Sequence, residues 1–520
     1  MRRRRRVIVI ITSILVAIVV IGTAAYGYVR YRYDQIQQLN VNGLNSATSS
    51  SQPENILLVG DNSRCTLTKY SSFYKTHKQN FGSCSQVGGG RSDVTMILHV
   101  NPAQHQAYLL SIPRDLWLPM PGGNGLQLRV DDSLNAAETS YLHLPFGPTL
   151  LVKAIEQDLG IPINHYVELN FYTFEQVVNT LGGVTIDFPT KLVDHYSGLN
   201  ITHPGCQHLN GSQALALVRA RHLYYYDPAT GSWNYDGTGD LGRIQRTHIF
   251  LRVLATQVKS SALSNPLQAN ALLGSVIPSL KVDKGFTLSS MVSLALAFQH
   301  VNPAAIPSAT LPVIIPSSPF RDNANPSNYQ APGSIVLPFQ PQDLKLVTTF
   351  LGSSAPQYAK ISPHSVSLSV LNGSGVSGQA ATTAAQFTRL GFRVVSTGNA
   401  TYAGTDSETV VSYKPGDLAQ AEKVLSEISG QAIMAEGSAN QGADIVVTTG
   451  STFSIAAPAT AASSPATATS SSSPPATGTA GSSGASQATP AASVAQTAAN
   501  GLWTATHQAP WWDPKACPAK

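Results

Sequence analysis

The sequence has little charge and few cysteines for its length. Lys, Arg, Asp and Glu together make up 12% of its 520 residues, and there are four cysteines. No two cysteines have CxxC spacing, which argues against a structural zinc site. The 33 basic and 28 acidic residues give a net charge of +5, but five of the arginines lie at positions 2–6. The rest of the chain therefore has no net basic excess, and the charge balance gives no support to nucleic-acid binding.

One long hydrophobic run is present, at the N-terminus. It extends from Val7 to Ala25, directly after the arginines at positions 2–6, and the next charge is Arg30. This pattern predicts a membrane-spanning helix over residues 7–29 and a cytoplasmic basic stub at 1–6. The alternative is a cleaved secretory signal, because Thr23–Ala25 resembles a cleavage site. The length of the run favours the uncleaved single-pass anchor, and in both cases the bulk of the chain lies outside the cytoplasm.

The composition divides the rest of the chain into a linker, a large globular domain, a second linker, a smaller domain and a tail. Their ranges are 30–53, 54–352, 353–365, 366–454 and 455–520. The tail is predicted to be disordered, because up to residue 502 it is almost wholly Ala, Ser, Thr, Pro and Gly. Its last residues, which include Trp511, Trp512 and Cys517, depart from that bias without a sequence-based explanation.

The alternation of strand and helix patterns predicts an α/β fold for both globular parts. Short apolar runs bounded by turn residues predict strands at 55–60, 94–100, 107–112 and 184–188. Helical patterns cover 148–159, 173–181 and 209–217, the last with an Asn or Ser cap. We therefore expect a layered domain with a central mixed sheet flanked by helices. The smaller domain has strands at 366–370, 392–395 and 445–449 and a helix at 380–390, which predicts a compact α/β unit.

The cysteines fit an oxidising exterior. Cys65 and Cys84 lie at the two ends of a polar segment. They either form a disulfide that closes this segment into a loop or remain two free thiols. Cys206 and Cys517 have no partner that the sequence identifies.

The charged residues gather in four short motifs at the ends of apolar runs. They are Arg91–Asp93, Ile112–Asp115, Arg219–Arg221 and Asp240–Arg246. Arginines that converge with carboxylates suit a phosphate ligand with a divalent cation bridging it. Ligands of open α/β sheets also bind at strand ends, where several of these motifs lie.

Arg219 and Arg221 are two residues apart, which places them on one face of an extended segment. Two adjacent guanidinium groups can hold a phosphate bidentately, although taken alone the pair is better explained as solvated surface charge. Asp240, Arg243 and Arg246 line one side of the first turns of a predicted helix that runs from Arg243 to Val258. Two arginines at a helix start oppose the helix macrodipole, so helix capping does not explain why they are there. A nearby anion or metal ion would explain them.

Read together, these motifs resemble the LytR-CpsA-Psr family of cell-wall ligases over about residues 54–352. The segments that carry the resemblance are Gly60–Arg64, Arg91–Asp93, Ser111–Trp117, Ile163–Phe171, Leu181–Val184, Leu209–Leu215, Arg219–Arg221 and Asp240–Arg246. Residues 366–449 resemble the LytR C-terminal domain. The resemblance implies a membrane-anchored, Mg²⁺-dependent phosphotransferase that faces the cell wall. It would move glycopolymers from a polyprenyl-diphosphate carrier onto peptidoglycan and form a phosphodiester.

The resemblance also implies roles for individual residues. Asp93 and Asp61 would bind Mg²⁺, and Asp240, Arg114 and Arg243 would be catalytic. The diphosphate would be bound by Arg91, Arg114, Arg219, Arg221, Arg243 and Arg246. Two positions depart from the family pattern: Asn62 stands where an Asp ligand is usual, and Thr247 stands where the family has glutamine.

Two alternatives to a ligase remain open at this point. One is a non-catalytic anchor that binds the lipid diphosphate or the wall, and the other is a hydrolase of the same carrier. A polyprenyl chain needs an apolar tunnel, for which the candidate walls are residues 146–159, 171–181 and 249–258. Each of these helices can equally be an ordinary core helix.

Overall fold

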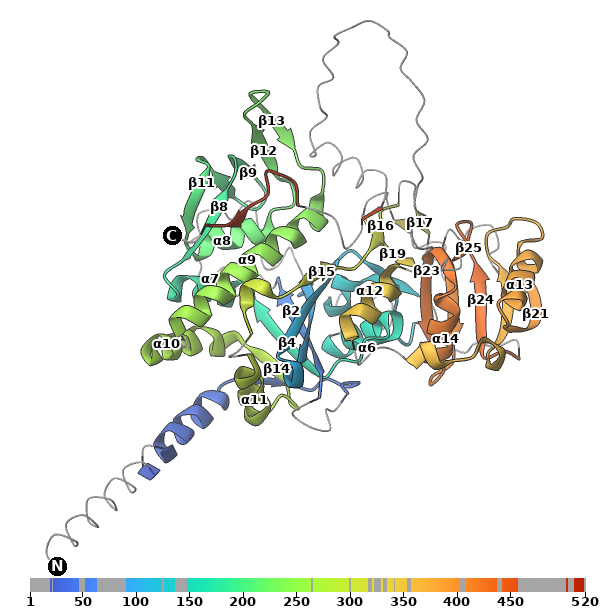
Figure 1. Cartoon of the computed structure of the whole chain (residues 1–520), viewed down its shortest axis with the longest axis horizontal. Helices are drawn as coiled ribbons and strands as arrows, with labels where there is room; N and C mark the ends of the chain where they lie inside the picture. The colour runs from blue at the N-terminus through green and yellow to red at the C-terminus, as the bar shows by residue number, and fades with distance from the viewer. Residues whose placement is uncertain are drawn as a thin grey trace, which may run out of the picture.

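The computed structural model describes most of the chain (Figure 1). The described residues are 19–20, 22–45, 52–62, 90–123, 126–135, 147–262, 265–298, 301–316, 320–321, 329–330, 334–340, 342–352, 357–401, 408–436, 442–456, 502–503 and 509–518. Among these residues, no helix is both long and apolar enough to cross a bilayer. The predicted span over 7–29 lies largely outside the described residues, and Cys65 and Cys84 lie wholly outside them.

A seven-stranded mixed sheet forms the centre of the large domain, in the order β1-β14-β7-β2-β3-β4-β15. Its strands are β1 (Gln37–Leu39), β2 (Glu54–Asp61), β3 (Ser92–Asn101), β4 (Gln106–Ile112), β7 (His165–Asn170), β14 (Lys281–Asp283) and β15 (Ser308–Thr310). β2 and β7 are parallel, and β3 is antiparallel to both β2 and β4. The ends of β2, β7 and β4 and the start of β3 therefore meet at one edge of the sheet.

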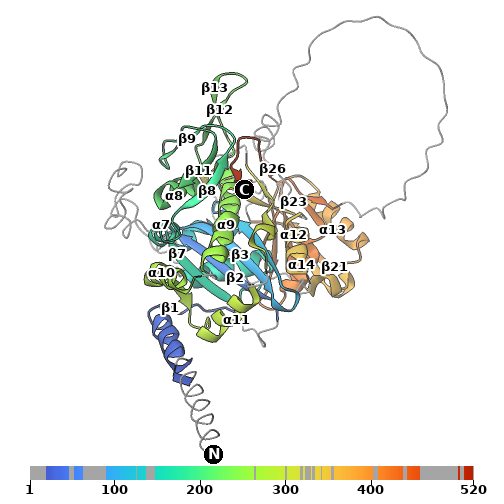
Figure 2. The same ribbon diagram turned by 60° about the vertical axis from the view of Figure 1, so that its left-hand side comes forward.

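The two faces of this sheet have different environments because side chains alternate along each strand. Leu57, Ile97 and Leu110 are fully buried and belong to one core with helix α6 (Pro148–Leu159). Their neighbours Leu58, Leu98 and Leu109 are only half-buried and face helix α9 (Gly239–Ala262). Figure 2 shows α9 crossing in front of β2 and β3. The central mixed sheet with flanking helices confirms the predicted fold class.

The large domain contains further helices and strands around this sheet. The helices are α7 (Phe171–Thr180), α8 (Gly211–Arg219), α10 (Pro266–Val276), α11 (Leu288–Phe298) and α12 (Gln342–Leu351). The strands are β5 (Trp117–Pro119), β6 (Gln127–Arg129), β8 (Val184–Phe188), β9 (Leu192–Asp194), β10 (Leu199–Ile201), β11 (Gly205–Leu209), β12 (Tyr224–Asp227), β13 (Ser232–Tyr235), β16 (Val313–Ile314), β17 (Phe320–Arg321), β18 (Tyr329–Gln330) and β19 (Leu337–Gln340). β12 and β13 form a hairpin that projects from the domain (Figure 1).

The C-terminal unit continues a sheet that begins in the large domain. Its elements are β20 (Ser367–Asn372), α13 (Gln379–Arg389), β21 (Arg393–Asn399), β22 (Thr409–Tyr413), α14 (Leu418–Leu425), β23 (Ile428–Glu436), β24 (Ile445–Thr449) and β25 (Ser454–Ile455). β19 of the large domain pairs with β23, so one sheet passes from one unit into the other. The predicted small α/β unit is confirmed, but it is joined to its neighbour by backbone hydrogen bonds as well as by a linker.

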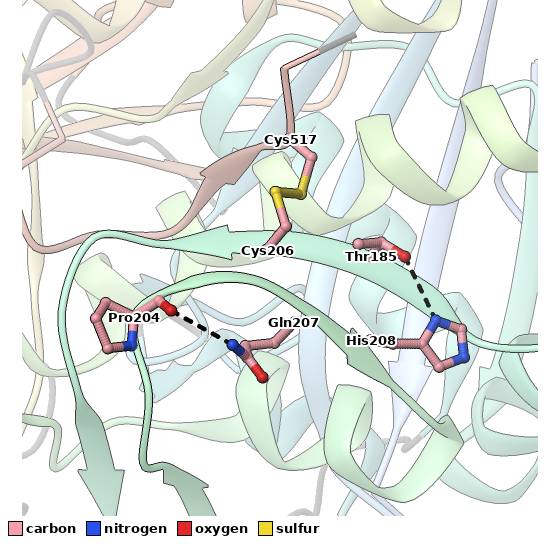
Figure 3. The surroundings of a disulfide bond; sticks show 6 residues. All are labelled: Thr185, Pro204, Cys206, Gln207, His208 and Cys517. Atoms are coloured by element: carbon pink, nitrogen blue, oxygen red, sulfur yellow. Dashed lines mark hydrogen bonds between the residues drawn. A yellow bond between two sulfur atoms is a disulfide. The ribbon is translucent and has the colours of Figure 1, made fainter. Parts of the chain in front are cut away.

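The prediction that residues 455–520 are disordered to the end is wrong for the last described residues. β26 (Leu502–Trp503) pairs with β16, and β27 (Lys515–Ala516) pairs with β8. Cys517 forms a disulfide with Cys206 of β11, 311 positions earlier in the chain (Figure 3). The physical reason is that Trp512 and Asp513 are almost fully buried against the folded domain, in its apolar core and in an ion pair with Arg246. We call residues 509–518 the C-terminal strap.

Helix α6 also contacts the C-terminal unit through buried polar groups. Tyr413 donates a hydrogen bond to the carbonyl of Gln157 at 3.1 Å, and the backbone N–H of Met434 donates to Asp158 at 3.2 Å. Asp158 is 2% exposed, and burial raises its pKa to about 7. The nearby carboxyl of Asp343 is also buried, and burial raises its pKa well above the usual range. The interface therefore favours protonated carboxyls.

This raised pKa predicts a pH-dependent stability. Between about pH 4 and 7 the unfolded chain ionises Asp158 while the folded chain keeps it protonated, so stability falls as pH rises. One such group changes the free energy of unfolding by at most about 1.4 kcal/mol per pH unit. We expect Asp158→Asn to reduce the difference in Tm between pH 5 and pH 8, measured by calorimetry. The exposed Asp34→Asn is the matched control, and an unchanged difference in Asp158→Asn would contradict the assignment.

Candidate functional site

The charged motifs meet at the sheet edge where β4 ends and β3 begins. Arg114 lies two residues after the end of β4, and its Nη1 donates to Asp93 Oδ1 at the start of β3. Thr95 lies opposite Ile112 in the antiparallel ladder, which explains why two residues 21 positions apart come into contact. Arg114 is 9% exposed, so the pair lies in a partly desolvated environment where charges interact more strongly than at the surface.

The pKa of Asp93 indicates that more than one arginine converges on it. Burial alone would raise this pKa, but the surrounding guanidinium groups outweigh it and hold the pKa below its ordinary value. In decreasing order of effect, these groups belong to Arg114, Arg243, Arg221 and Arg219. The structure thus brings together residues from β3, the β4 end, α8 and α9. The sequence predicted this set for one ligand, and the structure places it around one carboxylate.

Arg219 and Arg221 reach the site from a different backbone than predicted. Asn210 and Gln213 form a capping box that starts α8 at Gly211, and the helix ends with Arg219. Arg219 is therefore helical, and Ala220 has an extended conformation that redirects the chain before Arg221. The Arg219 guanidinium lies 5.2 Å from the centroid of the Phe171 ring, a cation–π contact that fixes its direction.

Asp240 and Arg243 form a tight pair in the first turns of α9. Arg243 donates from Nε to Oδ1 at 2.7 Å and from Nη2 to Oδ2 at 3.1 Å, which is a bidentate arrangement. Burial would raise the pKa of Asp240, but Arg243 and then Arg114 outweigh it and lower the pKa. Asp240 therefore stays ionised and holds the Arg243 fork in one orientation. Thr247 donates its hydroxyl to the carbonyl of Arg243, so this side chain bonds its own helix.

A second group of charges surrounds Arg114, and of its members the sequence motifs had included only Asp115. Asp115 and the fully buried Asp131 lie 3.3 and 3.6 Å from Arg114, and Arg129 reaches both of them and Asp132. Burial would lower the pKa of Arg114, but Asp93, Asp115 and Asp131 outweigh it and raise the pKa. Burial raises the pKa of Asp131 to about 7. The signal was present as Arg129–Asp132, a charged cluster in a chain with few charges.

Two residues of the predicted site, Arg91 and Asp61, make contacts outside the group of arginines around Asp93. Arg91 pairs with Asp132 at 3.1 Å, so it belongs to the second group of charges around Arg114. Asp61 approaches Gly90, where a Cβ would lie 2.7 Å from its Oδ1, and it lies close enough to Tyr166 to affect the pKa of that phenol. Asn62 is used locally: its Oδ1 accepts from the backbone N–H of Arg91 at 3.2 Å. Within the described ranges, no group of three or more His, Cys, Asp or Glu residues is arranged to hold a metal.

Arg246, which was predicted to bind the diphosphate, is fully buried in a separate cluster. Its Nη1 contacts Asp236 at 2.9 Å and Asp513 of the C-terminal strap at 3.1 Å. Its Nη2 donates to the carbonyl of Ala220 at 3.0 Å. Arg243 and Arg246 are three residues apart in α9, a rotation of about 300°, so their side chains diverge by about 60°. That divergence is enough for Arg246 to face Asp236 and the C-terminal strap while Arg243 pairs with Asp240. We therefore remove Arg246 from the set of ligand-contacting residues.

An apolar cavity of about 480 Å³ lies between the sheet and α9. Its walls include Leu58, Leu98, Leu109, Leu251, Leu254, Ala255, Val258, Ala295 and Phe298. His248, also in the wall, contacts the hydroxyl of Ser111 at 2.7 Å, and Ser111 is the penultimate residue of β4. Of the three helices predicted to line a tunnel, only α9 contributes. α6 packs on the opposite face of the sheet, and α7 is part of a different core.

One helix connects the cavity to the arginines. Arg243 and Leu251 are eight residues apart in α9, which corresponds to about 12 Å along the helix axis. A ligand with an anionic head and an apolar tail can therefore occupy both places at once. The N-terminal part of the helix would contact the head, and its middle would contact the tail.

Two protein-family models match the chain. The LytR_cpsA_psr family model matches residues 25–335. The model described as LytR cell envelope-related transcriptional attenuator matches residues 365–453.

Several curated proteins are similar in sequence. The probable cell wall biosynthesis protein LcpB of Corynebacterium glutamicum is 31% identical over 260 residues, which are 50% of this chain and 54% of that protein. Cell wall biosynthesis protein LcpA of the same organism is 27% identical over 476 residues, 84% of this chain and 85% of that protein. The polyisoprenyl-teichoic acid–peptidoglycan teichoic acid transferase TagU of Enterococcus faecalis is 32% identical over 218 residues, 42% and 62% of the two chains. The chain thus spans about half of the first of these relatives and most of the second.

A solved structure of a LytR-Csp2A-Psr enzyme from Actinomyces oris aligns with a TM-score of 0.41 at 24% identity. The alignment covers 54% of this chain and 87% of that one.

Proposed function

Because the chain belongs to the LytR-CpsA-Psr family, we propose that it is a membrane-anchored phosphotransferase of cell-wall assembly. It moves a glycopolymer from a polyprenyl-diphosphate carrier to peptidoglycan, outside the cytoplasm. The names of the relatives LcpA and TagU support the biological context. The observation that carries the proposal is the convergence of Arg114, Arg243, Arg221 and Arg219 on Asp93.

The arginines bind the diphosphate. A diphosphate carries several negative oxygens, and guanidinium forks are the side chains best matched to them. Arg243 is held ready by Asp240, and Arg219 is steadied against the Phe171 ring. Fixed donors of this kind stabilise the charge that develops in phosphoryl transfer, which depends mainly on positioning and charge neutralisation.

The residues present fit a Mg²⁺ ion that binds together with the substrate. Mg²⁺ in proteins usually takes one or two carboxylates and completes its coordination with water and substrate phosphates. Asp93 supplies an ionised carboxylate among the diphosphate-binding arginines, and its low pKa keeps it available. When bound, the metal would neutralise charge on the phosphate oxygens. Asp61 ends the neighbouring strand β2, opposite Ser92 in the ladder. We propose Asp93 as the metal ligand because its carboxylate lies among the arginines.

The reaction forms one oxygen–phosphorus bond and breaks another. A hydroxyl of the peptidoglycan sugar attacks the phosphorus nearer the glycan, the bond from that phosphorus to the bridging oxygen breaks, and polyprenyl phosphate leaves. We propose that the hydroxyl proton goes to Asp115, which lies 3.3 Å from Arg114 in the charge cluster. Burial raises the pKa of this carboxyl, whereas Arg243 and Arg114 lower the pKa of Asp240. A general base works best with a pKa near the operating pH. Asp240 then has the role of orienting Arg243.

The apolar cavity is proposed to take the polyprenyl chain. Filling it by Ala255→Trp is expected to weaken binding of a polyprenyl diphosphate about tenfold or more, because excluding even two methylenes costs about 1.6 kcal/mol. Binding of inorganic pyrophosphate should be unchanged. The exposed neighbour Thr256→Trp is the matched control on the same helix. Titration calorimetry measures both ligands, and equal lipid affinity in the two variants would count against the cavity.

The function itself is tested with a lipid-diphosphate oligosaccharide and peptidoglycan oligomers, incubated with the full chain in detergent. Mass spectrometry of the products, with and without Mg²⁺, distinguishes the alternatives. A metal-dependent adduct of oligosaccharide and peptidoglycan supports the ligase. Binding of the lipid without conversion would indicate an anchor, and release of glycan phosphate into water without an adduct would indicate a hydrolase.

A further inference from the structure

The C-terminal strap is attached to the large domain by four kinds of contact. β27 adds a third strand to the β8–β11 sheet, with Lys515 opposite Asp187. Cys517 is bonded to Cys206 on the same sheet (Figure 3). Trp512 is 1% exposed and stacks on Tyr225 of β12, with 3.9 Å between ring centroids and 4° between planes. The buried ion pair of Asp513 with Arg246 is the fourth contact.

The ion pair leads directly to the arginines of the candidate site. Arg246 has no exposed side-chain surface, and its Nη1 is shared between Asp513 and Asp236. Its other terminal nitrogen donates to the carbonyl of Ala220. Ala220 is the single residue between Arg219 and Arg221, and its extended conformation sets the angle at which the chain leaves α8. The position of the Arg246 guanidinium thus fixes the peptide that carries both arginines.

The sequence at the start of α9 also accommodates the Arg246 guanidinium. A Cβ on Gly242 would lie 2.0 Å from Thr238 Oγ1 and 3.1 Å from Arg246 Nη1, so only glycine lets these groups approach the first turn of α9. Thr238 in turn donates to Asp236 at 2.7 Å. The ion pairs and hydrogen bonds around Arg246 therefore come from two parts of the chain. One part is α9 with Asp236, and the other is the C-terminal strap.

We propose that the C-terminal strap is a working part of the candidate site, in which Asp513 is a positioning residue. Through Arg246 it holds the Ala220 carbonyl, and thereby Arg219 and Arg221, where they bind the diphosphate. Without Asp513, Arg246 moves toward Asp236, its remaining ionic partner, and the Ala220 peptide shifts with it. This inference rests on the proposed diphosphate-binding role of the arginine pair.

The test is binding of inorganic pyrophosphate, with Mg²⁺, to the full chain by titration calorimetry. Asp513→Asn is expected to weaken the affinity about tenfold, less than the roughly 10²-fold that a misplacement of about 1 Å can cost in rate. Asp513→Glu keeps the negative charge beside Arg246, so this variant is expected to fold. Its longer side chain displaces Arg246, so the pyrophosphate affinity should also be weaker than in the wild type. Lys515→Ala, in the same strap but with an exposed side chain, is the control and should bind like the wild type.

A double-mutant cycle distinguishes positioning from general stability. If Asp513 acts through Arg246, Asp513→Asn changes pyrophosphate affinity in the wild type but adds nothing in an Arg246→Met background. Additive effects, or wild-type affinity in folded Asp513→Asn, would overturn the role of the strap while leaving the proposed function intact. Failure of the wild type itself to bind pyrophosphate would overturn both.

Discussion

Replacing Arg114 by alanine is expected to reduce kcat/KM for glycopolymer transfer by about 10³-fold or more. Loss of one donor fixed against developing charge typically costs 10²–10³-fold in rate. Arg114 also contacts Asp93, Asp115 and Asp131, so its removal leaves three carboxylates close together without their common cation. The mutual repulsion would raise the pKa of Asp93 and disturb the remaining arginines as well.

Arg114→Lys separates charge from geometry. Lysine restores one positive charge, but a single ammonium cannot reach three carboxylates in the manner of a planar guanidinium. We expect partial recovery of folding and little recovery of rate. Thermal unfolding of both variants is measured beside the kinetics, because removing one partner of a buried charge cluster costs about 3–5 kcal/mol. A folded Arg114→Ala enzyme that retains a rate within tenfold of the wild type would contradict the assignment.

The second large effect is expected for Asp93→Asn, which keeps the size of the side chain and removes its charge. We predict a fall in transfer rate of about 10³-fold and the loss of any response to Mg²⁺ concentration, because the substituted amide is a poor ligand for a hard cation. The measurement is the rate as a function of Mg²⁺ concentration. Arg114 remains in this variant, so substrate binding falls less than the rate does.

Asp61→Asn is the matched control for the metal assignment. Asp61 lies at the end of the adjacent strand β2, but its carboxylate approaches Gly90. We therefore expect its Mg²⁺ response to remain close to that of the wild type. If Asp61→Asn shifted the Mg²⁺ dependence as strongly as Asp93→Asn, the metal would have two carboxylate ligands and our single-ligand account would be wrong.

Local sequence patterns predicted the elements of the large domain well. The expected helix at 148–159 matches α6 at both ends, since Pro148 starts it and Gly160 ends it in the left-handed conformation. The strand predicted at 184–188 coincides with β8. The prediction for Arg219 failed because the capping box of α8 sets the start of the helix but not its length. The end of that helix is decided by tertiary contacts around Ala220, which no local pattern records.

The candidate site was predictable in composition more than in arrangement. The motifs identified the arginines that converge on Asp93, because charges at strand ends are unusual in a chain with so few of them. They did not distinguish Arg243 from Arg246, since the partner that buries Arg246 comes from the strap, 267 positions away. Amino-acid composition did not predict that the C-terminal strap is ordered. The strap has only a few aromatic and charged residues at the end of a low-complexity segment, and these become buried only against the folded domain. Such contacts follow from the tertiary structure alone.

The central claim is that this site transfers a phosphoryl group together with the glycan. The most direct measurement uses a lipid-diphosphate oligosaccharide labelled with ³²P in the phosphate nearer the sugar, in a reaction with peptidoglycan oligomers and the full chain. Our account predicts that the label enters the peptidoglycan product and is absent when Arg114 is replaced by alanine. Peptidoglycan that gains the sugar without the label would mean that the sugar–phosphate bond breaks instead, and it would contradict a phosphotransferase.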